Sequence, residues 1–360
     1  MPGVDVAVIG GGIVGCATAA FLAEGGASVL LAEREAIAAG ASGRNSGIVQ
    51  HPMDATLLPL FEATVAHYRE LAAHGFTLPA APGGLIVLAE EEAALAHELE
   101  ALAAFPELRA EALAPGEPAR VEPCLAPGLA GIRLEAGYAV PPAAATAAFA
   151  ARADAAGARL AIGEDAVLAP GGIAVGGRTV AAGAVVVAAG PWTPAVVDPS
   201  GAWRPIAPLW GVNVEVHLAE PPRHAVEQAG IDALIETGGD PPPLFSMVTA
   251  GGVSSLGSTF LSAEPDASAF APRLRANGSR FVPALATTPI ASVRACARPL
   301  SADGRPLLGR APGRDDVFVA AGHGAWGISL GPGSARLVAD LVLGRGDGPP
   351  AVFDPARFPA

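Results

Sequence analysis

The sequence predicts an α/β protein in which a Rossmann-like dinucleotide-binding domain of discontinuous segments is joined to an α+β domain with a mostly antiparallel sheet. Three observations carry this prediction. The N-terminus has the order strand, glycine-rich turn, helix and strand that a dinucleotide site requires. The middle of the chain alternates apolar and polar residues with the period of antiparallel strands. The C-terminal region returns to a strand, a glycine-rich turn and a helix.

The N-terminal motif supplies the features of a nucleotide site in a fixed order. Gly10 allows a sharp turn out of the first strand, and Gly12 leaves room for a pyrophosphate at the positive N-terminus of the next helix. Gly15 allows that helix to pack closely on the sheet. Glu33 ends the second strand, where a carboxylate accepts hydrogen bonds from ribose hydroxyls and would repel a 2′-phosphate. We therefore expect a dinucleotide other than NADP.

The next elements follow from periodicity and turn residues. After a small-residue loop at 39–47 we expect an amphipathic helix at 56–74, a strand at 84–89 and a helix at 91–105. A second α/β unit is then expected, with a helix at 143–156, strands at 160–162 and 185–190, and between them a hairpin that turns at Gly176 and Gly177. Antiparallel strands within 203–293, a strand at 317–320 and a helix at 333–343 complete the chain.

These elements predict two domains that alternate along the chain. The nucleotide-binding domain is expected to combine residues 1–54, 141–200 and 294–360, and the substrate domain residues 55–140 and 201–293. A length of 360 residues suits two such domains.

Composition excludes several classes of protein. The formal net charge of −13 argues against nucleic-acid binding and against an anionic membrane surface. All 22 basic residues are arginine, so a Schiff-base lysine and a P-loop lysine are both excluded. The longest apolar stretches are too short for a transmembrane segment, and no basic segment precedes the N-terminal apolar run.

The cysteines indicate a reducing compartment. Cys16, Cys124 and Cys296 are widely separated, which argues against a disulfide framework and against a zinc site. We therefore expect a cytoplasmic protein without a structural metal.

Four blocks form a larger pattern that spans almost the whole chain. They are the N-terminal motif ending at Glu33, GASGRNSG at 40–47, VVVAAGPW at 185–192, and RPLSADGRPLLG at 298–309 followed by AGHGAWGIS at 321–329. The pattern resembles the FAD-dependent D-amino-acid oxidase superfamily, which includes glycine oxidase, D-amino-acid dehydrogenase and sarcosine oxidase. The resemblance implies that the dinucleotide is FAD and that the Rossmann-like domain binds it.

The resemblance also implies which residues contact FAD. Small residues at 40–47 let backbone N–H groups approach the phosphates and the flavin edge. The helix after the turn at 322–329 would place its positive end near the flavin N1/C2 carbonyl, which favours hydride acceptance. The implied contacts are Gly10, Gly12, Ile13, Val14, Gly15, Glu33, Arg34, Ala41, Ser42, Arg44, Asn45, Ser46, Gly47, Ile48, Val167, Ala189, Gly190, Trp192, Cys296, Arg298, Gly322, His323, Gly324, Ala325, Trp326, Gly327 and Ile328.

The implied reaction is oxidation of the C–N bond of a small amino acid, namely a D-amino acid, glycine or an N-methyl amino acid. A neutral amine transfers its α-hydrogen as hydride to flavin N5, and the imine then hydrolyses in water. Such chemistry needs orientation and charge complementarity more than acid–base groups, and the sequence shows no Ser/His/Asp or paired-carboxylate motif. The electron acceptor would be oxygen, a quinone or another acceptor.

Arg298, His51 and His323 are the candidate catalytic residues. The family's arginine at the position of Arg298 grips the substrate carboxylate; the alternative is a structural salt bridge beside the turn at Asp303. His51 and Gln50 follow the flavin loop, so each is expected near the ring or in the substrate site. Sarcosine oxidases use a lysine to activate oxygen and this chain has none, so an arginine, His51 or His323 would serve in an oxidase.

Further residues have two interpretations each. Cys296 matches the position of a cysteine covalently bound to flavin in monomeric sarcosine oxidases, or is simply a small residue that fits. Trp210 and Trp326 line the substrate pocket or pack ordinarily. Arg44 suits a phosphate or loop contact better than a substrate contact.

Two other functions stay open. Residues 44–49 and 84–87 also resemble L-2-hydroxyglutarate dehydrogenases, and oxidation of a 2-hydroxy acid would require a base near N5. The third interpretation is a flavin subunit of a multi-subunit dehydrogenase. Turnover by the isolated chain, or a stable homo-oligomer, would discriminate between this third interpretation and a self-sufficient enzyme.

Overall fold

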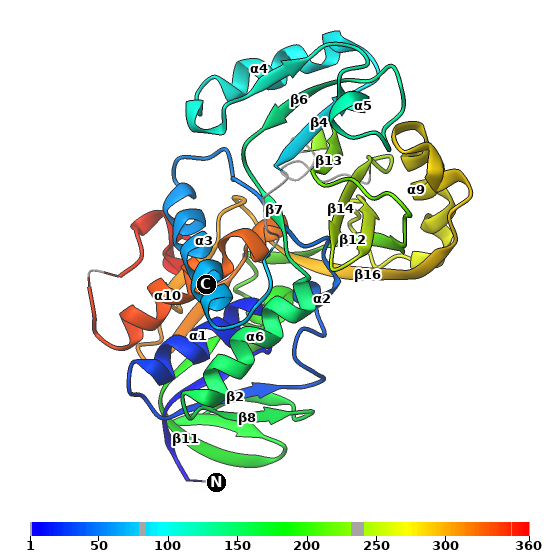
Figure 1. The fold of residues 1–360 in the computed structure, drawn as a ribbon. Helices are drawn as coiled ribbons and strands as arrows, with labels where there is room; N and C mark the ends of the chain where they lie inside the picture. The colour runs from blue at the N-terminus through cyan, green and yellow to red at the C-terminus, as the bar shows by residue number, and fades with distance from the viewer. Residues whose placement is uncertain (1, 79–83, 232–240, 347, 360) are drawn as a thin grey trace.

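The computed structural model describes residues 2–78, 84–231, 241–346 and 348–359. Two large sheets organise these residues, and helices cover both (Figure 1). None of the helices within these ranges combines the length and the apolar character needed to cross a bilayer.

The first sheet has a parallel core. Its strand order is β17 (Leu307–Arg310), β18 (Val317–Ala321), β11 (Arg178–Val187), β1 (Val4–Ile9), β2 (Val29–Glu33) and β8 (Arg159–Ile162). Only β17 runs antiparallel to its neighbour along this path. Strands β9 (Ala166–Ala169) and β10 (Gly172–Val175) extend β11 as a meander, with the expected turn at Gly176 and Gly177.

Each face of the first sheet buries its own apolar cluster. Helices cover one face, and their buried side chains pack on Val8, Leu31 and Val186; they are α1 (Ile13–Glu24), α3 (Leu58–Ala73), α6 (Pro142–Ala155) and α10 (Gly327–Val342). The other face, with Ile9 and Val187, packs on the β9–β10 meander and on α7 (Thr193–Val197). A strand buried on both sides explains the continuous apolar runs of the sequence.

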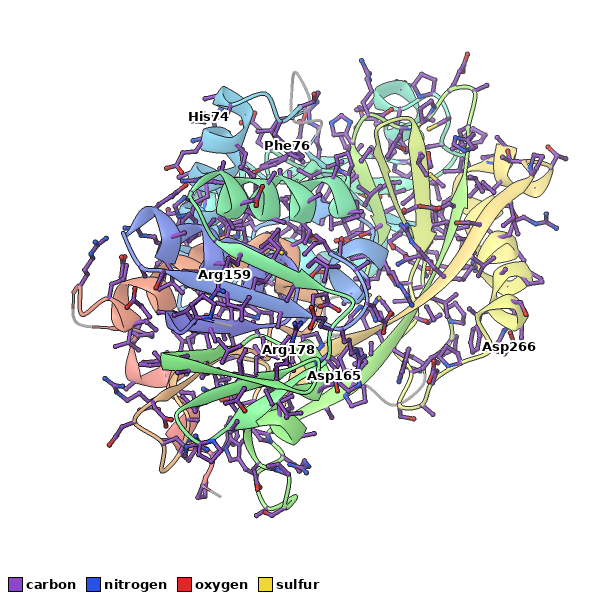
Figure 2. All side chains as sticks on the ribbon, turned by 90° about the horizontal axis from the view of Figure 1, so that it is seen from below. His74, Phe76, Arg159, Asp165, Arg178 and Asp266 are labelled. Carbon is purple, nitrogen blue, oxygen red and sulfur yellow. The ribbon has the colours of Figure 1, made fainter. Side chains whose placement is uncertain are left out.

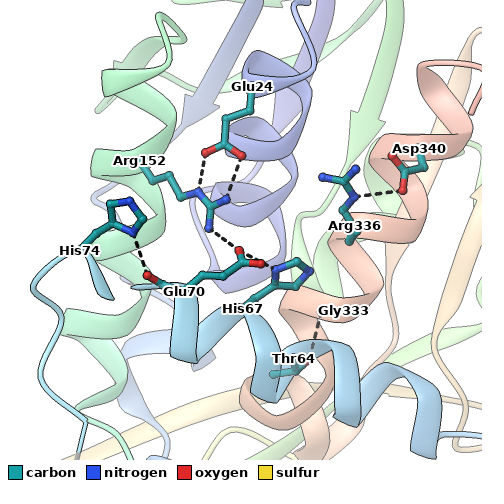
Figure 3. A network of polar contacts seen from close by, with 9 residues as sticks. All are labelled: Glu24, Thr64, His67, Glu70, His74, Arg152, Gly333, Arg336 and Asp340. Carbon is teal, nitrogen blue, oxygen red and sulfur yellow. Dashed lines mark hydrogen bonds and ion pairs between the residues drawn. The ribbon is translucent and has the colours of Figure 1, made fainter. Parts of the chain in front are cut away.

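Polar contacts join the helices of the covered face (Figure 3). The guanidinium of Arg152 on α6 donates to both carboxylate oxygens of Glu24 on α1 and to Glu70 on α3. The hydroxyl of Thr64 on α3 accepts from the Gly333 N–H of α10 at 2.9 Å. These contacts hold α3, although it comes from the segment predicted to belong to the substrate domain, against the nucleotide-binding sheet.

The second sheet is mostly antiparallel. Its order is β16 (Ile290–Ser301), β12 (Ile206–Val216), β15 (Val253–Gly257), β14 (Ser246–Ala250), β13 (Ala225–Gln228), β4 (Leu85–Ala89), β6 (Ala130–Leu134) and β5 (Glu111–Leu113), with β13 and β4 parallel. Helix α9 (Ala267–Phe281) covers one face, and α4 (Ala96–Leu102) packs on the other face near β4 and β6. Asp266, labelled in Figure 2, caps α9 by accepting from Ser268 N–H at 3.0 Å.

Short elements complete the fold. They are α2 (Ala41–Arg44), α5 (Pro118–Val121), the paired strands β3 (Ile48–Val49) and β7 (Tyr138–Ala139), and the 3₁₀ turns η1 (Glu92–Leu95), η2 (Pro106–Leu108), η3 (Gly190–Trp192), η4 (Pro283–Ala286), η5 (Gly324–Trp326), η6 (Ala351–Phe353) and η7 (Pro355–Arg357).

The mixed α/β fold class is confirmed, and three element predictions need correction. The helix expected at 333–343 begins at Gly327, because Pro332 is accommodated inside it. The helix expected at 91–105 is a 3₁₀ turn, η1, followed by α4, which ends at Leu102. Helix α9 lies in a region expected to be all strands. The predicted domain boundary at 294 falls inside β16, which pairs with β12 as far as Ser301; the division into domains stays a prediction.

Candidate active site

A large cavity lies at the carboxyl ends of the parallel strands. Its volume is about 540 Å³, and it is lined by the last residues of β1 and β2 and by Ala188, directly after β11. Ligands of open α/β sheets bind at this edge. The expected cofactor contacts that line it are Gly10, Gly12, Ile13, Val14, Glu33, Arg34, Ala41, Ser42, Arg44, Asn45, Ala189, Gly190, Trp192, Cys296, Arg298, His323, Gly324, Ala325, Gly327 and Ile328.

The glycines of the first turn have different tasks. Gly10 has φ +116°, and a Cβ there would lie 2.4 Å from the Ala188 carbonyl oxygen. A Cβ at Gly15 would lie 1.9 Å from the Gly10 oxygen, so this glycine allows α1 to pack on the turn. At Gly12 the only close neighbour of a Cβ is Ser42 Oγ at 3.0 Å. Gly12 therefore keeps the N-terminus of α1 open to the cavity.

Hydrogen bonds fix the second glycine-rich loop against the first. Ser42 Oγ accepts from Ile13 N–H at 2.9 Å. The Asn45 side chain donates to the carbonyls of Ala41 and Ser42 at 2.9 and 3.0 Å and accepts from Gly47 N–H at 2.7 Å. Both loops thus present ordered backbone to the same cavity, as phosphate recognition requires.

An acidic group and a stacked pair line the cavity near the end of β2. Glu33 accepts from the N–H groups of Gly11 at 2.6 Å and Glu35 at 2.9 Å, which fixes its carboxylate. The guanidinium of Arg34 lies 4.4 Å from the ring centroid of Trp192. Asp165, labelled in Figure 2, also lines the cavity. This part combines hydrogen-bond acceptors for ribose hydroxyls with a flat stacking surface.

The N-terminus of α10 opens on the same cavity. Gly327 and Ile328 of its first turn line the wall, and no side chain caps its first N–H groups. Its positive end therefore attracts negative charge. His323, just before the turn, bonds through Nε2 to Ser334 Oγ at 2.9 Å, and burial lowers the His323 pKa to about 4. The ring is therefore neutral near pH 7.

These features fit FAD. Two helix N-termini, two ordered glycine loops and a fixed carboxylate beside one strand end match a dinucleotide with two phosphates and a ribose. The volume lies within the range of cofactor clefts. When bound, FAD supplies the capacity to accept a hydride.

A second, smaller cavity adjoins the first. Its volume is about 80 Å³, and Asn45, Arg298 and Ala325 line both cavities. Gln50, Ser46, Ile48 and Trp326 of the expected residues line only this one, together with Leu85, Asn213, Ala225, Val226, Glu227, Ile231, Ser246, Val248, Ser258, Phe260 and Ser329.

Arg298 is held at the junction by contacts that leave its charge available. Nη1 donates to the Thr259 carbonyl at 2.8 Å, and the guanidinium lies 4.9 Å from the Phe260 ring centroid. A Cβ at Gly211 would lie 2.4 Å from Nη2, so the guanidinium lies directly over this glycine. No ion pair of the described residues involves Arg298, and Asp303 pairs instead with Arg357 at 2.8 Å. The expected alternative, a structural salt bridge at Asp303, is therefore not seen.

His51 lies away from both cavities. Its ring packs between Phe61 and Phe105, with centroids 5.5 and 5.4 Å away, and its Nδ1 accepts from Met53 N–H at 3.1 Å. Its Nε2 lies 3.5 Å from a Glu107 carboxylate oxygen. Burial lowers the His51 pKa. The expected catalytic and substrate-binding roles of His51 are not supported, because the chain turns away after Gln50.

The remaining expected residues divide between the cavities and the surrounding structure. Trp210 lines the large cavity and Trp326 the small one. Cys296 lines the large cavity, and burial raises the pKa of its thiol.

Val167 is 52% exposed and lines neither cavity, whereas its neighbours Asp165 and Ala166 line the large one. Gly15, Gly47 and Gly322 also line neither and act through the backbone packing around the turns.

Sequence reasoning missed the residues that the second sheet contributes. Asn213, Glu227, Ser246, Ser258 and Phe260 line the small cavity from strands or strand ends. A single polar residue in an alternating strand carries no local signal for this role. Only the pairing of distant strands brings these side chains together.

Comparison with known proteins agrees with this geometry. A family described as "DAO: FAD dependent oxidoreductase" matches residues 5–341. A glycine oxidase from Geobacillus kaustophilus is 29% identical, with 94% of this chain and 92% of that protein covered. A D-amino acid dehydrogenase from Xanthobacter autotrophicus is 31% identical over 48% of this chain and 40% of that protein.

The solved structures agree as well. The crystal structure of the Geobacillus kaustophilus glycine oxidase superposes with a TM-score of 0.84 and 27% identity, covering 99% of each chain. An iminodiacetate oxidase from Chelativorans, at 24% identity, shares the fold with a TM-score of 0.81, covering 97% of this chain and 98% of that one. The chain therefore belongs to the DAO family of FAD-dependent oxidoreductases, and the expectations of FAD as cofactor and of an oxidase or dehydrogenase activity are confirmed.

Proposed function

We propose that this enzyme oxidises the C–N bond of a small amino acid, such as a D-amino acid, glycine or an N-methyl amino acid, by hydride transfer to the flavin, with hydrolysis of the imine in water. The observation that carries the proposal is Arg298, a guanidinium without an acidic partner among the described residues, at the junction of the cofactor cavity and the small cavity.

Arg298 suits the substrate carboxylate for geometric reasons. Its contacts with Thr259 and Phe260 fix the plane of the guanidinium, so the fork can bind a carboxylate through two parallel hydrogen bonds. Burial lowers the Arg298 pKa but leaves the group charged near pH 7. An anion placed there holds its α-carbon at the boundary between the two cavities. Orientation of this kind is the main contribution the protein makes to hydride transfer.

Neither candidate histidine is available as a base beside the flavin, which favours an amine over a 2-hydroxy acid. A neutral amine can lose its α-hydrogen as hydride without a base, whereas an alcohol needs one. His51 lies outside both cavities, and His323 is bonded to Ser334 through Nε2. No specific feature therefore supports the 2-hydroxy-acid alternative.

Electrons are expected to leave to oxygen, a quinone or another acceptor. The sequence has no lysine, and the arginines that line the large cavity among the described residues are Arg34, Arg44 and Arg298. If oxygen is the acceptor, Arg44 or Arg298 is the cation available to stabilise the negative charge that develops during its reduction.

Product analysis tests the proposed function. The isolated, FAD-loaded chain is incubated with D-amino, N-methyl and 2-hydroxy acids, with oxygen or a quinone as acceptor. We expect equal amounts of a 2-oxo acid and of ammonia or methylamine from the amino acids. Turnover of 2-hydroxy acids alone would overturn the proposal, and turnover that requires an added protein would favour the subunit interpretation.

A further inference from the structure

The small cavity carries an acidic group as well as Arg298. Glu227 on β13 is 7% exposed and lines this cavity. Gln50 Nε2 donates to its Oε1 at 3.4 Å, and the Gln50 backbone N–H is held by Ser329 Oγ at 3.0 Å. A carboxyl group therefore has a fixed place in the wall of the same cavity as the guanidinium.

The two charges come from distant strands of one sheet. Arg298 lies on β16 and Glu227 on β13, four strand spacings away in the order β16, β12, β15, β14 and β13. At roughly 4.8 Å per spacing, their strands are about 19 Å apart across the sheet, and Arg298 lies four residues along β16 from Arg294, which pairs with Asn213. The acidic end and the cationic end of the pocket are thus separate.

The register of the sheet places Glu227 on the face that lines the small cavity. Glu227 is paired with Ser246 on β14, and Ser246 with Gly257 on β15. A Cβ at Gly257 would lie 2.9 Å from Asn213 Oδ1, so this row continues to β12. Asn213, Ser246 and Glu227 line the small cavity, on the face opposite to the one that α9 covers.

The volume of the small cavity suits a side chain. A group the size of a water molecule, such as a methylene, needs roughly 10–15 Å³ of cavity volume. The small cavity, at about 80 Å³, therefore has room for about six such groups. Arg298 also lines the large cavity, so a carboxylate on Arg298 would lie at the junction, together with the α-carbon beside it. The remaining space would receive the rest of the substrate, and Glu227 lines it.

We propose that Glu227 selects an amino acid whose side chain ends in an ammonium group. The inference rests on the proposed function and deepens it, because Arg298 binds the α-carboxylate and Glu227 the distal cation. A buried carboxylate is stabilised by a cation that it can hydrogen-bond directly. Val248 and Phe260, apolar residues that also line the cavity, would contact the methylene groups of such a side chain.

The test compares ornithine with norleucine, which replaces the terminal ammonium by a methyl group of similar size. Anaerobic bleaching of the FAD-loaded enzyme gives the second-order rate constant of flavin reduction for both enantiomers of each amino acid. We expect the wild-type enzyme to prefer ornithine at least about tenfold, since a charged hydrogen bond contributes about 1.5–3 kcal/mol. Glu227→Gln keeps the shape and removes the charge, so the ornithine-to-norleucine ratio should fall about tenfold. Glu111→Gln, an exposed position on β5 of the same sheet, is the matched control and should leave the ratio unchanged.

The outcomes separate this inference from the proposed function. Wild-type enzyme that is reduced by neutral amino acids but shows no advantage for ornithine overturns the inference alone. Equal loss of rate for ornithine, norleucine and glycine in Glu227→Gln also overturns it, because Glu227 would then serve the α-amine or the fold. Failure of every amino acid to reduce the flavin overturns the proposed function and this inference with it. The wild-type preference requires no variant, so misfolding of Glu227→Gln does not remove the test.

Discussion

The two cavities are built from different kinds of structure. Glycine turns, strand ends and helix N-termini form much of the wall of the large cavity, and Gly12 and Gly327 leave backbone open to the ligand there. Side chains from the second sheet, such as Asn213 and Glu227, form much of the wall of the small one. Recognition through backbone demands particular residues at fixed spacing and so produces a motif. Recognition through side chains on paired strands does not.

The largest effect is expected at the junction of the two cavities, which Arg298 lines. Arg298→Ala should lower kcat/KM for amino acids at least about 100-fold, because the substrate carboxylate loses two charged hydrogen bonds. Any loss of FAD affinity should be smaller than the loss of kcat/KM, because Arg298 is only one of the many residues that line the large cavity. Stopped-flow reduction and FAD titration of the same preparation measure both.

Arg310→Ala is the matched control for Arg298. Its guanidinium also stacks on an aromatic ring, 4.8 Å from the Phe318 centroid, but Arg310 is exposed and lines neither cavity. Its kinetics should equal those of the wild type. Equal losses in both variants would show that the Arg298 effect is structural.

The second largest effect is expected from a substitution in the wall of the large cavity. Gly12→Ala should raise the Kd of FAD about tenfold or more, since the new methyl group enters the space at the N-terminus of α1, and overpacking costs about 1–3 kcal/mol. Rates at saturating FAD should keep the same order of substrate preference. Gly128→Ala, where a Cβ meets open space, is the control, and a Kd raised equally there would contradict the assignment.

The third effect concerns acid stability. Folded His323 has a pKa of about 4, below its usual value of 6.5, so the unfolded chain binds more protons between these two values. Acidification from pH 6.5 to 5.5 should therefore lower stability by about 1 kcal/mol through this residue, with further loss towards pH 4. Thermal melts should show a smaller loss of Tm over this range in His323→Asn. An NMR titration of the His323 ring with a midpoint near 6.5 would contradict its buried, neutral state.

The smallest effect is expected at Cys296. Burial raises the pKa of its thiol, which disfavours the thiolate needed to attack the flavin. We therefore expect acid precipitation of the holoenzyme to release all of its yellow colour, and Cys296→Ser to keep normal FAD content. Colour that stays with the precipitated wild-type chain but not with the variant would establish covalent attachment.

The sequence was sufficient for much of the nucleotide site. The turn at Gly10, Gly12 and Gly15 follows its motif, because a positive φ and close backbone approaches admit few other residues. His51 lines neither cavity although its neighbour Gln50 lines the small one, because the His51 ring packs between two phenylalanines, and sequence proximity alone does not reveal such a turn. Glu227 could not be found, because its place depends on strand pairing across the sheet.

Anaerobic mixing of the FAD-loaded enzyme with glycine or alanine, and with the 2-hydroxy acids glycolate and lactate, tests the central claim most directly. If Arg298 presents a small amino acid to the flavin, an amino acid should bleach the visible absorbance in wild-type enzyme, and the 2-hydroxy acids should not. Bleaching should become far slower in Arg298→Ala with the flavin still bound. A chain that does not retain FAD, or one that only 2-hydroxy acids reduce, would contradict the account.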